Sequence, residues 1–190
     1  MSWNRTIKQD LAGEPAGVRA AVLRYLNRRE YTQGELRQRL RERGAAAADI
    51  EAALEYVQER GFQDDARAAE SYIRQRLAYA PRGRALLKQE LKERGISSGL
   101  AAALLEEHYP PELERELLQR LLQKEARLEQ AQLEKARLAA EPSAAGAAQK
   151  ARRLRQKMAR RLLAKGFRQS LVIEELAEWL PAAEETDFME

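Results

Sequence analysis

Three segments of the chain share one pattern, in which two apolar residues four positions apart are followed, four positions later, by glycine. Residues four apart lie on the same face of a helix, and glycine suits the left-handed conformation that commonly ends one. A cation precedes each glycine, where it meets the negative end of the helix dipole. The pattern therefore predicts three helices of one kind. The sets are Leu36, Leu40 and Gly44; Leu87, Leu91 and Gly95; and Met158, Leu162 and Gly166.

The apolar register continues past the glycines at matching positions. Six residues on stand Ile50, Ala101 and Val172, and ten residues on stand Leu54, Leu105 and Leu176. A pattern that returns at this length indicates a tandem repeat whose members complete each other's cores. We therefore expect an all-α, elongated array in which one helical unit is used three times.

The composition agrees with a helical, folded chain. Of the 190 residues, 44% are hydrophobic and only 6% aromatic, and Ala, Leu, Glu and Arg dominate, a mixture that favours helix. No run approaches the roughly 20 apolar residues of a membrane span, so we expect no membrane association. Cysteine is absent, which excludes disulfides and thiolate metal sites and is consistent with a cytoplasmic location.

Breakers and helix-start signals divide the chain into five parts. Thr32 with Glu35 forms a capping box, and Asp64-Asp65 is expected to cap a later helix. In the third repeat, the first helix is expected to run from 112 to about 140 and to bury Leu113, Leu117 and Leu121. The expected parts are a flexible arm (1–17), repeat 1 (18–63), repeat 2 (64–111), repeat 3 (112–180) with a flexible joint near 141–148, and an acidic disordered tail (181–190).

Three stretches carry a resemblance to a known family. They are YTQGELRQRL at 31–40, GFQDDARAAESYI at 61–73 and GRALLKQELKERGIS at 83–97. Together they resemble the RecX family, bacterial regulators of the RecA recombinase. The resemblance extends over about 18–180 and is strongest over 25–97. The chain departs from the family pattern at Ala68, where an aromatic is usual, at Pro81, and in the greater length of 112–150.

The resemblance implies both a fold and a function. The implied fold is a curved array of three three-helix repeats that lies in the groove of the RecA filament on DNA. The implied function is to inhibit RecA ATP hydrolysis, strand exchange and coprotease activity, and so to modulate DNA repair and recombination. The family performs no chemistry of its own and needs no cofactor. We expect a cytoplasmic monomer.

The residues themselves offer little to catalysis. The chain has one histidine, His108, and neither a phosphate-binding glycine loop nor a two-histidine metal motif. Asp64 and Asp65 could serve as a carboxylate pair, but their position at a helix start favours capping. His108 has no second histidine with which to hold a metal, so we interpret it as a residue at a helix end. These patterns do not predict an enzyme.

The distribution of charge is more informative than the formal net charge of +4. Two stretches contain bases and no acids, between Glu70 and Glu90 and between Glu141 and Glu174. The first is either a solvated face or a binding surface, whereas the second favours binding because its bases repel one another without an acidic partner. Arg153, Lys157 and Arg160 can face outward while Met158 and Leu162 face the core. The candidate contact residues are Arg74, Arg76, Arg82, Arg84, Lys88, Arg152, Arg153, Lys157, Arg160, Arg161 and Lys165.

The acidic partner could be the protein filament, DNA phosphate, or both. DNA contact is expected to be weak and non-specific, because the helices offer few side chains that read base edges. A non-sequence-specific nucleic-acid-binding protein is therefore the alternative hypothesis. A structural adaptor that dimerises through the 112–140 helix ranks last, since the apolar spacing there is too irregular for a sustained heptad.

Overall fold

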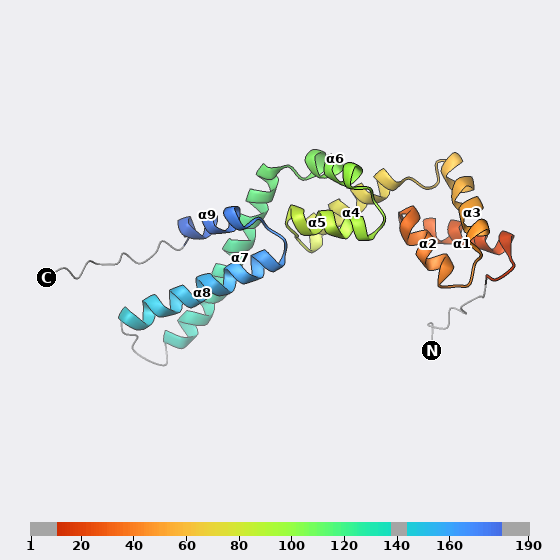
Figure 1. The fold of residues 1–190 in the computed structure, drawn as a ribbon. Coiled ribbons are helices and arrows are strands. Elements are labelled where there is room, and N and C mark those ends of the chain that lie inside the picture. The colour runs from red at the N-terminus through yellow and green to blue at the C-terminus, as the bar shows by residue number, and fades with distance from the viewer. Residues whose placement is uncertain (1–10, 138–143, 180–190) are drawn as a thin grey trace, which may run out of the picture. The chain divides into compact units, whose positions relative to one another are not determined.

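The computed structural model describes residues 11–137 and 144–179, and this part of the chain consists of helices joined by turns, without a strand (Figure 1). The predicted all-α class is confirmed. None of the described helices is long and apolar enough to cross a membrane. In chain order the helices are α1 (Pro15–Leu26), α2 (Gln33–Arg41), α3 (Ala47–Glu59), α4 (Asp65–Tyr79), α5 (Arg84–Glu93), α6 (Ser98–His108), α7 (Pro111–Arg137), α8 (Ala144–Ala164) and α9 (Gln169–Trp179).

The chain divides into two compact units, each of which is described by itself. Unit 1 comprises Met1–Gln75 and Lys88–His108, and unit 2 comprises Arg76–Leu87 and Tyr109–Glu190. Helices α4 and α5 contribute to both units. The repeats of the sequence and the compact units therefore divide the chain differently.

The three repeated glycines end their helices in the same way. Gly44, Gly95 and Gly166 have φ values of 79°, 89° and 82°, which favour glycine because a Cβ is strained there. In each case the amide of the next residue donates to the carbonyl five residues before it, a Schellman bond that satisfies a helix-end carbonyl. The pairs are Ala45 to Leu40 (3.1 Å), Ile96 to Leu91 (3.1 Å) and Phe167 to Leu162 (3.3 Å). The predicted helix ends are confirmed, including the first, where Ala45 occupies the apolar position.

The helix starts follow the predicted signals. At α2 the Thr32 hydroxyl accepts from the Glu35 amide, and the Glu35 carboxylate accepts from the Thr32 amide, both at 3.1 Å. At α4 a carboxylate oxygen of Asp64 accepts from the amides of Ala66 (2.7 Å) and Arg67 (3.1 Å). Both predicted caps are confirmed.

The core of unit 1 begins earlier in the chain than expected. Helix α1 packs against α2 and α3. Pro15 lies in its first turn, and Leu11, before it, is fully buried. The prediction of a flexible arm is therefore wrong for residues 11–17, while 1–10 lie outside the described residues. Leu11 is a single apolar residue among breakers, so no periodicity marks it. The buried members of this core are Leu11, Val18, Ala21, Val22, Tyr31, Leu36, Leu40, Ala45, Ile50, Ala53, Leu54 and Val57.

The core of unit 2 is formed by α7, α8 and α9, and it corrects the predicted face of α7. Leu113, Leu117 and Leu121 are only half-buried. The fully buried positions lie one residue further along, at Glu114, Leu118 and Leu122. The register shifts because the Glu114 carboxylate has a partner inside the unit, the amide of Arg84 at 2.8 Å. The apolar core consists of Leu118, Leu122, Met158, Leu162, Phe167, Leu171, Val172 and Leu176.

Helix α8 also begins earlier than expected. It starts at Ala144 and includes Gly146, so the predicted flexible joint is wrong for 144–148. The flanking alanines have the highest helix propensity, which outweighs the cost of about 1 kcal/mol for one glycine. Residues 138–143 and the predicted tail over 181–190 lie outside the described residues.

The carbonyl group immediately before each of the three capping glycines accepts a hydrogen bond from an earlier part of the chain. Helix-end carbonyls have no partner within their own helix, so these bonds satisfy them. Two of the donors, Thr32 and Gly83, stand directly before α2 and α5, the second helices of their repeats. The bonds are Leu11 N–H to Arg43 O (2.9 Å), the Thr32 hydroxyl to Arg94 O, and Gly83 N–H to Lys165 O (2.8 Å).

Two further glycines allow the backbones to approach closely where these hydrogen bonds form. We call these places the junctions. A Cβ atom on Gly34 would lie 2.5 Å from the carbonyl oxygen of Arg94. A Cβ atom on Gly83 would lie 2.1 Å from the carbonyl oxygen of Gly166. Both distances are shorter than any van der Waals contact, so either side chain would push two backbones apart.

We predict that Gly34→Ala and Gly83→Ala each lower the free energy of unfolding by about 1–3 kcal/mol, the usual cost of overpacking a close contact. Urea unfolding followed by circular dichroism measures the change. Gly99→Ala is the matched control, because Gly99 lies in α6 with no atom within 4 Å of the added Cβ. It is expected to be neutral or to stabilise by up to about 1 kcal/mol. Unchanged unfolding of both junction variants would contradict the close approach.

Candidate functional site

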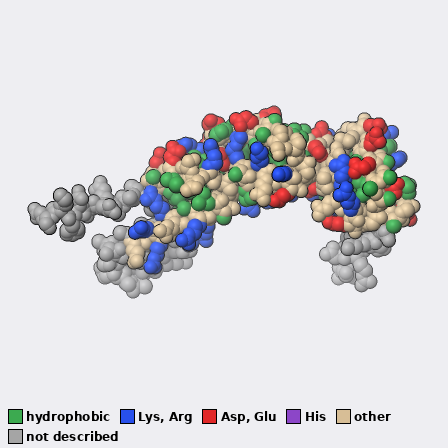
Figure 2. Space-filling view, in the orientation of Figure 1, with side chains coloured by type: hydrophobic (Ala, Val, Ile, Leu, Met, Phe, Trp, Pro, Cys, Tyr) green, Lys and Arg blue, Asp and Glu red, His purple; other side chains and the backbone are tan. Residues whose placement is uncertain are grey.

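The solvent-facing side of α8 carries a group of basic side chains. Arg152, Arg153, Lys157 and Arg160 are exposed, and we call these four residues the α8 cationic face. Met158 and Leu162 lie in the core of unit 2, so the predicted separation of outward bases from inward apolar residues is confirmed. Figure 2 shows Lys and Arg side chains gathered over the part of the molecule that carries α7 and α8.

The members of this face differ from the other bases of α8 in their partners. In the described part of the chain, no carboxylate pairs with Arg152, Arg153 or Arg160. Lys157 is exposed but has a contact of its own. By contrast, Arg161 pairs with Glu125 at 2.8 Å. Among the residues that the structure describes, three arginines of α8 thus have no carboxylate partner.

Two remaining bases of this stretch support the fold of unit 2. Arg155 donates to the carbonyl oxygen of Leu176 at 3.1 Å, which ties α8 to α9. Lys165 is half-buried, and its carbonyl accepts from Gly83 at a junction. Among the predicted contact residues of α8, Lys165 is thus the least exposed.

The predicted contact residues of the middle stretch, between Glu70 and Glu90, differ in their exposure and in their partners. Arg74 is exposed and pairs with Glu70 at 3.3 Å, one turn away. Arg84 is half-buried, and its guanidinium donates to the carbonyl oxygen of Tyr109. Arg76 and Arg82 are half-buried with contacts of their own. Lys88 is exposed.

A buried carboxylate that the sequence does not reveal holds the start of α5. Glu114 is fully buried; one of its oxygens accepts from the amide of Arg84 at 2.8 Å, and the other lies 3.4 Å from Nε of Arg168. A negative charge is favourable at the N-terminus of a helix. Burial, and then the charge of Glu114, raise the pKa of Tyr109, whose hydroxyl donates to the carbonyl oxygen of Arg82 at 2.9 Å. Nothing in the charged sequence of α7 distinguishes Glu114 from its neighbours.

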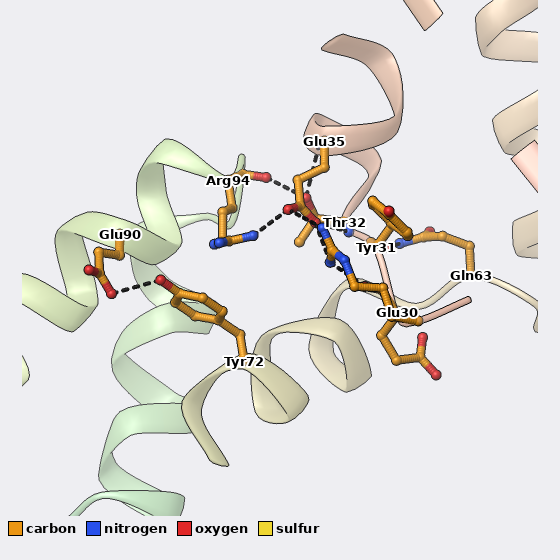
Figure 3. Close-up of polar contacts among 9 residues, drawn as sticks. Glu30, Tyr31, Thr32, Glu35, Gln63, Tyr72, Glu90 and Arg94 are labelled. Carbon is orange, nitrogen blue, oxygen red and sulfur yellow. Dashed lines mark hydrogen bonds and ion pairs between the residues drawn. The ribbon is translucent and has the colours of Figure 1, made fainter. Parts of the chain in front are cut away.

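In unit 1, a second carboxylate, Glu35, lies between two guanidinium groups (Figure 3). Arg29 donates to both of its oxygens, at 3.0 and 3.3 Å, and Arg94 pairs with one of them. The guanidinium of Arg94 also lies 3.8 Å above the ring of Tyr72. We call Arg29, Glu35, Arg94 and Tyr72 the Glu35 hub. Glu35 could be recognised in the sequence as a capping residue, but its partner Arg94, 59 residues later, could not.

The hub favours the ionised form of Glu35. Burial opposes ionisation, but the hydrogen bonds from Arg29 and the Thr32 amide, together with the charges of Arg94 and Arg29, outweigh it and lower the pKa of Glu35. Folding therefore gains stability from this carboxylate at neutral pH. That gain is present above the pKa of about 4.3 of an unfolded glutamate and is lost as the pH falls through the lower pKa of the folded state.

The residues considered for catalysis or metal binding have structural positions. Asp64 caps α4, and His108 is the last residue of α6, both as predicted. Among the described residues, no group of three or more His, Asp or Glu side chains could hold a metal ion. The prominent features of the site are thus charged surfaces and ion pairs.

Comparison with known proteins identifies two domains. The chain matches a model of the first three-helix domain of RecX over residues 19–56 and a model of the second three-helix domain over 64–105. The chain therefore contains two three-helix domains of the RecX type. The two matched segments cover the repeats in which the Glu35 hub lies.

The curated relatives that this chain resembles are named regulatory protein RecX. The relative from Halorhodospira halophila is 39% identical over 90 residues, which cover 47% of this chain and 55% of the relative. The relative from Chromohalobacter salexigens is 36% identical over 100 residues, which cover 53% of this chain and 65% of the relative. The chain thus spans 55% to 65% of the length of these relatives.

Solved structures share the fold over most of the chain. A crystal structure of regulatory protein RecX gives a TM-score of 0.66 at 24% identity, covering 86% of this chain and 71% of that one. The crystal structure of RecX from Lactobacillus salivarius gives 0.66 at 22% identity, covering 86% and 95%. At this identity the likeness establishes the helical repeat fold alone.

We predict that Glu35→Gln lowers the free energy of unfolding at pH 7 by about 1–3 kcal/mol, because two guanidinium groups lose a charged acceptor. Glutamine retains the capping box, so the variant isolates the charge. The difference from the parent should shrink as the pH falls below about 4. Glu51→Gln is the control: Glu51 forms a similar 2.8 Å pair with Arg37 but is exposed, so its removal should cost less than about 1 kcal/mol. Equal losses at both sites would contradict the role of the hub.

Proposed function

We propose that this chain is a non-catalytic regulator of the RecX family that binds the RecA filament on DNA and inhibits RecA ATPase, strand exchange and coprotease activity. The contact surface is the α8 cationic face. The observation that supports this assignment is the group of exposed arginines, Arg152, Arg153 and Arg160, without a carboxylate partner among the described residues. The chain acts as a monomer in the cytoplasm, where its partners are found.

The arrangement of these cations suits an extended acidic partner. Arg153 and Arg160 are seven residues apart on α8, which places them on one side of the helix at a separation of about 10 Å along its axis. Lys157 lies between them in sequence. Like charges held this close repel one another, and an acidic surface relieves the repulsion. Arginine side chains that face a filament or a phosphate backbone contribute affinity without reading sequence.

The middle stretch is a weaker candidate for the same contact. Arg74 and Arg84 have partners within the chain, with Glu70 and the Tyr109 carbonyl respectively. Their recruitment by a partner would first break these contacts. Lys88 is exposed and is the member of this stretch that we retain as a second contact.

We predict that the double reversal Arg153→Glu with Arg160→Glu abolishes most inhibition of RecA ATPase while leaving helicity and melting temperature nearly unchanged, since exposed charges contribute little to stability. Co-sedimentation with RecA-coated single-stranded DNA at physiological salt should show the matching loss of binding. The control is Arg24→Glu with Arg41→Glu, which changes the net charge equally at two exposed positions of α1 and α2 in unit 1. Equal inhibition by both double variants would contradict the assignment.

The same co-sedimentation distinguishes the alternative function. Binding to bare single-stranded DNA should be weaker than binding to the RecA-coated strand and should fall steeply with salt, because it releases counterions. Equal affinity for both would favour a non-sequence-specific nucleic-acid-binding protein.

A further inference from the structure

A cavity in unit 1 lies beside the Glu35 hub. Its volume is about 270 Å³, and it is bounded by α4, the start of α2 and the end of α5. Its lining includes Arg29, Arg94 and Tyr72 together with Ala68 and Ala69. The space is large enough for one side chain of a partner. It belongs to unit 1, whereas the α8 cationic face belongs to unit 2.

The guanidinium of Arg94 is incompletely used. One of its terminal nitrogens pairs with Glu35, whereas its other nitrogens form no hydrogen bond with the described residues. Figure 3 shows the second end of this guanidinium over Tyr72, without an interaction drawn. Stacking on the Tyr72 ring at 3.8 Å holds the plane of the group. A planar, oriented guanidinium edge matches the two oxygens of a carboxylate.

The two cations that line the cavity share one carboxylate. Arg29 and Arg94 both pair with Glu35. The other acidic residue of the lining, Glu30, pairs with Arg67 at 2.7 Å. Close by, Glu90 accepts from the Tyr72 hydroxyl at 2.8 Å. Glu35 is therefore the carboxylate that contacts both lining arginines among the described residues.

The lining also includes a small apolar surface. Ala68 and Ala69 are buried and end at Cβ. An aspartate or glutamate side chain has methylene groups that suit the alanines and a carboxylate that suits Arg94. A DNA strand instead presents charges in a continuous row, which suits the row on α8 better than a site for one group.

We propose that this cavity binds a carboxylate side chain from an acidic segment of a protein partner. Arg94 receives the carboxylate through its unused edge, and Tyr72 orients Arg94 as a positioning residue. This site goes beyond the proposed function, because it lies in unit 1 and does not depend on the α8 cationic face.

Fluorescence anisotropy with a labelled short peptide that carries two glutamates tests this site in the full chain. Ala68→Phe fills the cavity without changing a charge and should weaken binding about tenfold or more, with helicity and melting temperature retained. Ala68→Leu should give an intermediate loss and replaces the first variant if that one fails to fold. Arg94→Lys, which keeps the charge but loses the planar edge, should also weaken binding. The same peptide with glutamine in place of both glutamates should bind about tenfold more weakly, or weaker still.

Several outcomes would overturn the site. Unchanged peptide affinity in the Ala68 variants, or equal affinity for the glutamine analogue, would show that the cavity binds no carboxylate. Loss of oligonucleotide binding in Ala68→Phe with peptide binding intact would show a phosphate site instead. The reversal of Arg153 and Arg160 should leave peptide affinity unchanged, so failure here is separable from failure of the α8 surface.

Discussion

The carbonyl group before each capping glycine needs a donor from outside its own helix, and the described structure depends on how that need is met. At Arg94 and Lys165 the donors are the residues that stand directly before α2 and α5. At Arg43 no earlier repeat exists in the described chain, and Leu11 supplies the bond. Leu11 therefore completes the first repeat in the way that Thr32 and Gly83 complete the next two. This explains why a residue ahead of the first helix is fully buried.

The junctions also determine which charges remain for a partner. Around the first, Arg29 and Arg94 are held by Glu35, and around the second, Glu114 binds the Arg84 amide and pairs with Arg168. The packing of the repeats engages these bases, although Arg94 keeps one edge of its guanidinium for the cavity. Helix α8 begins at Ala144, well before Leu154, the first of its described residues that packs against the core of unit 2. The outer side of α8 takes no part in a junction between repeats. The concentration of exposed arginines there follows from this difference.

Local signals in the sequence were sufficient for the helix ends and insufficient for the contacts between distant segments. Gly44, Gly95 and Gly166, and the box of Thr32 and Glu35, act through neighbours a few residues away, so their spacing predicts them. Leu11, Glu114 and Arg94 act through partners more than 25 residues away, and no short pattern contains both members. The face of α7 was mispredicted for this reason. The outward side of α8 was predictable because one helix, with Met158 and Leu162 inward, determines it.

The most direct test of the account is a photo-cross-linking measurement on the assembled RecA filament. Gln156 is exposed on α8 between Arg153 and Arg160, and Gln38 is exposed on α2 of unit 1. A photoreactive amino acid at position 156 should cross-link the chain to RecA or to the DNA it coats, and the same group at position 38 should do so much less. Efficient cross-linking from position 38 with none from position 156 would show that the partner binds elsewhere and would contradict the assignment of α8.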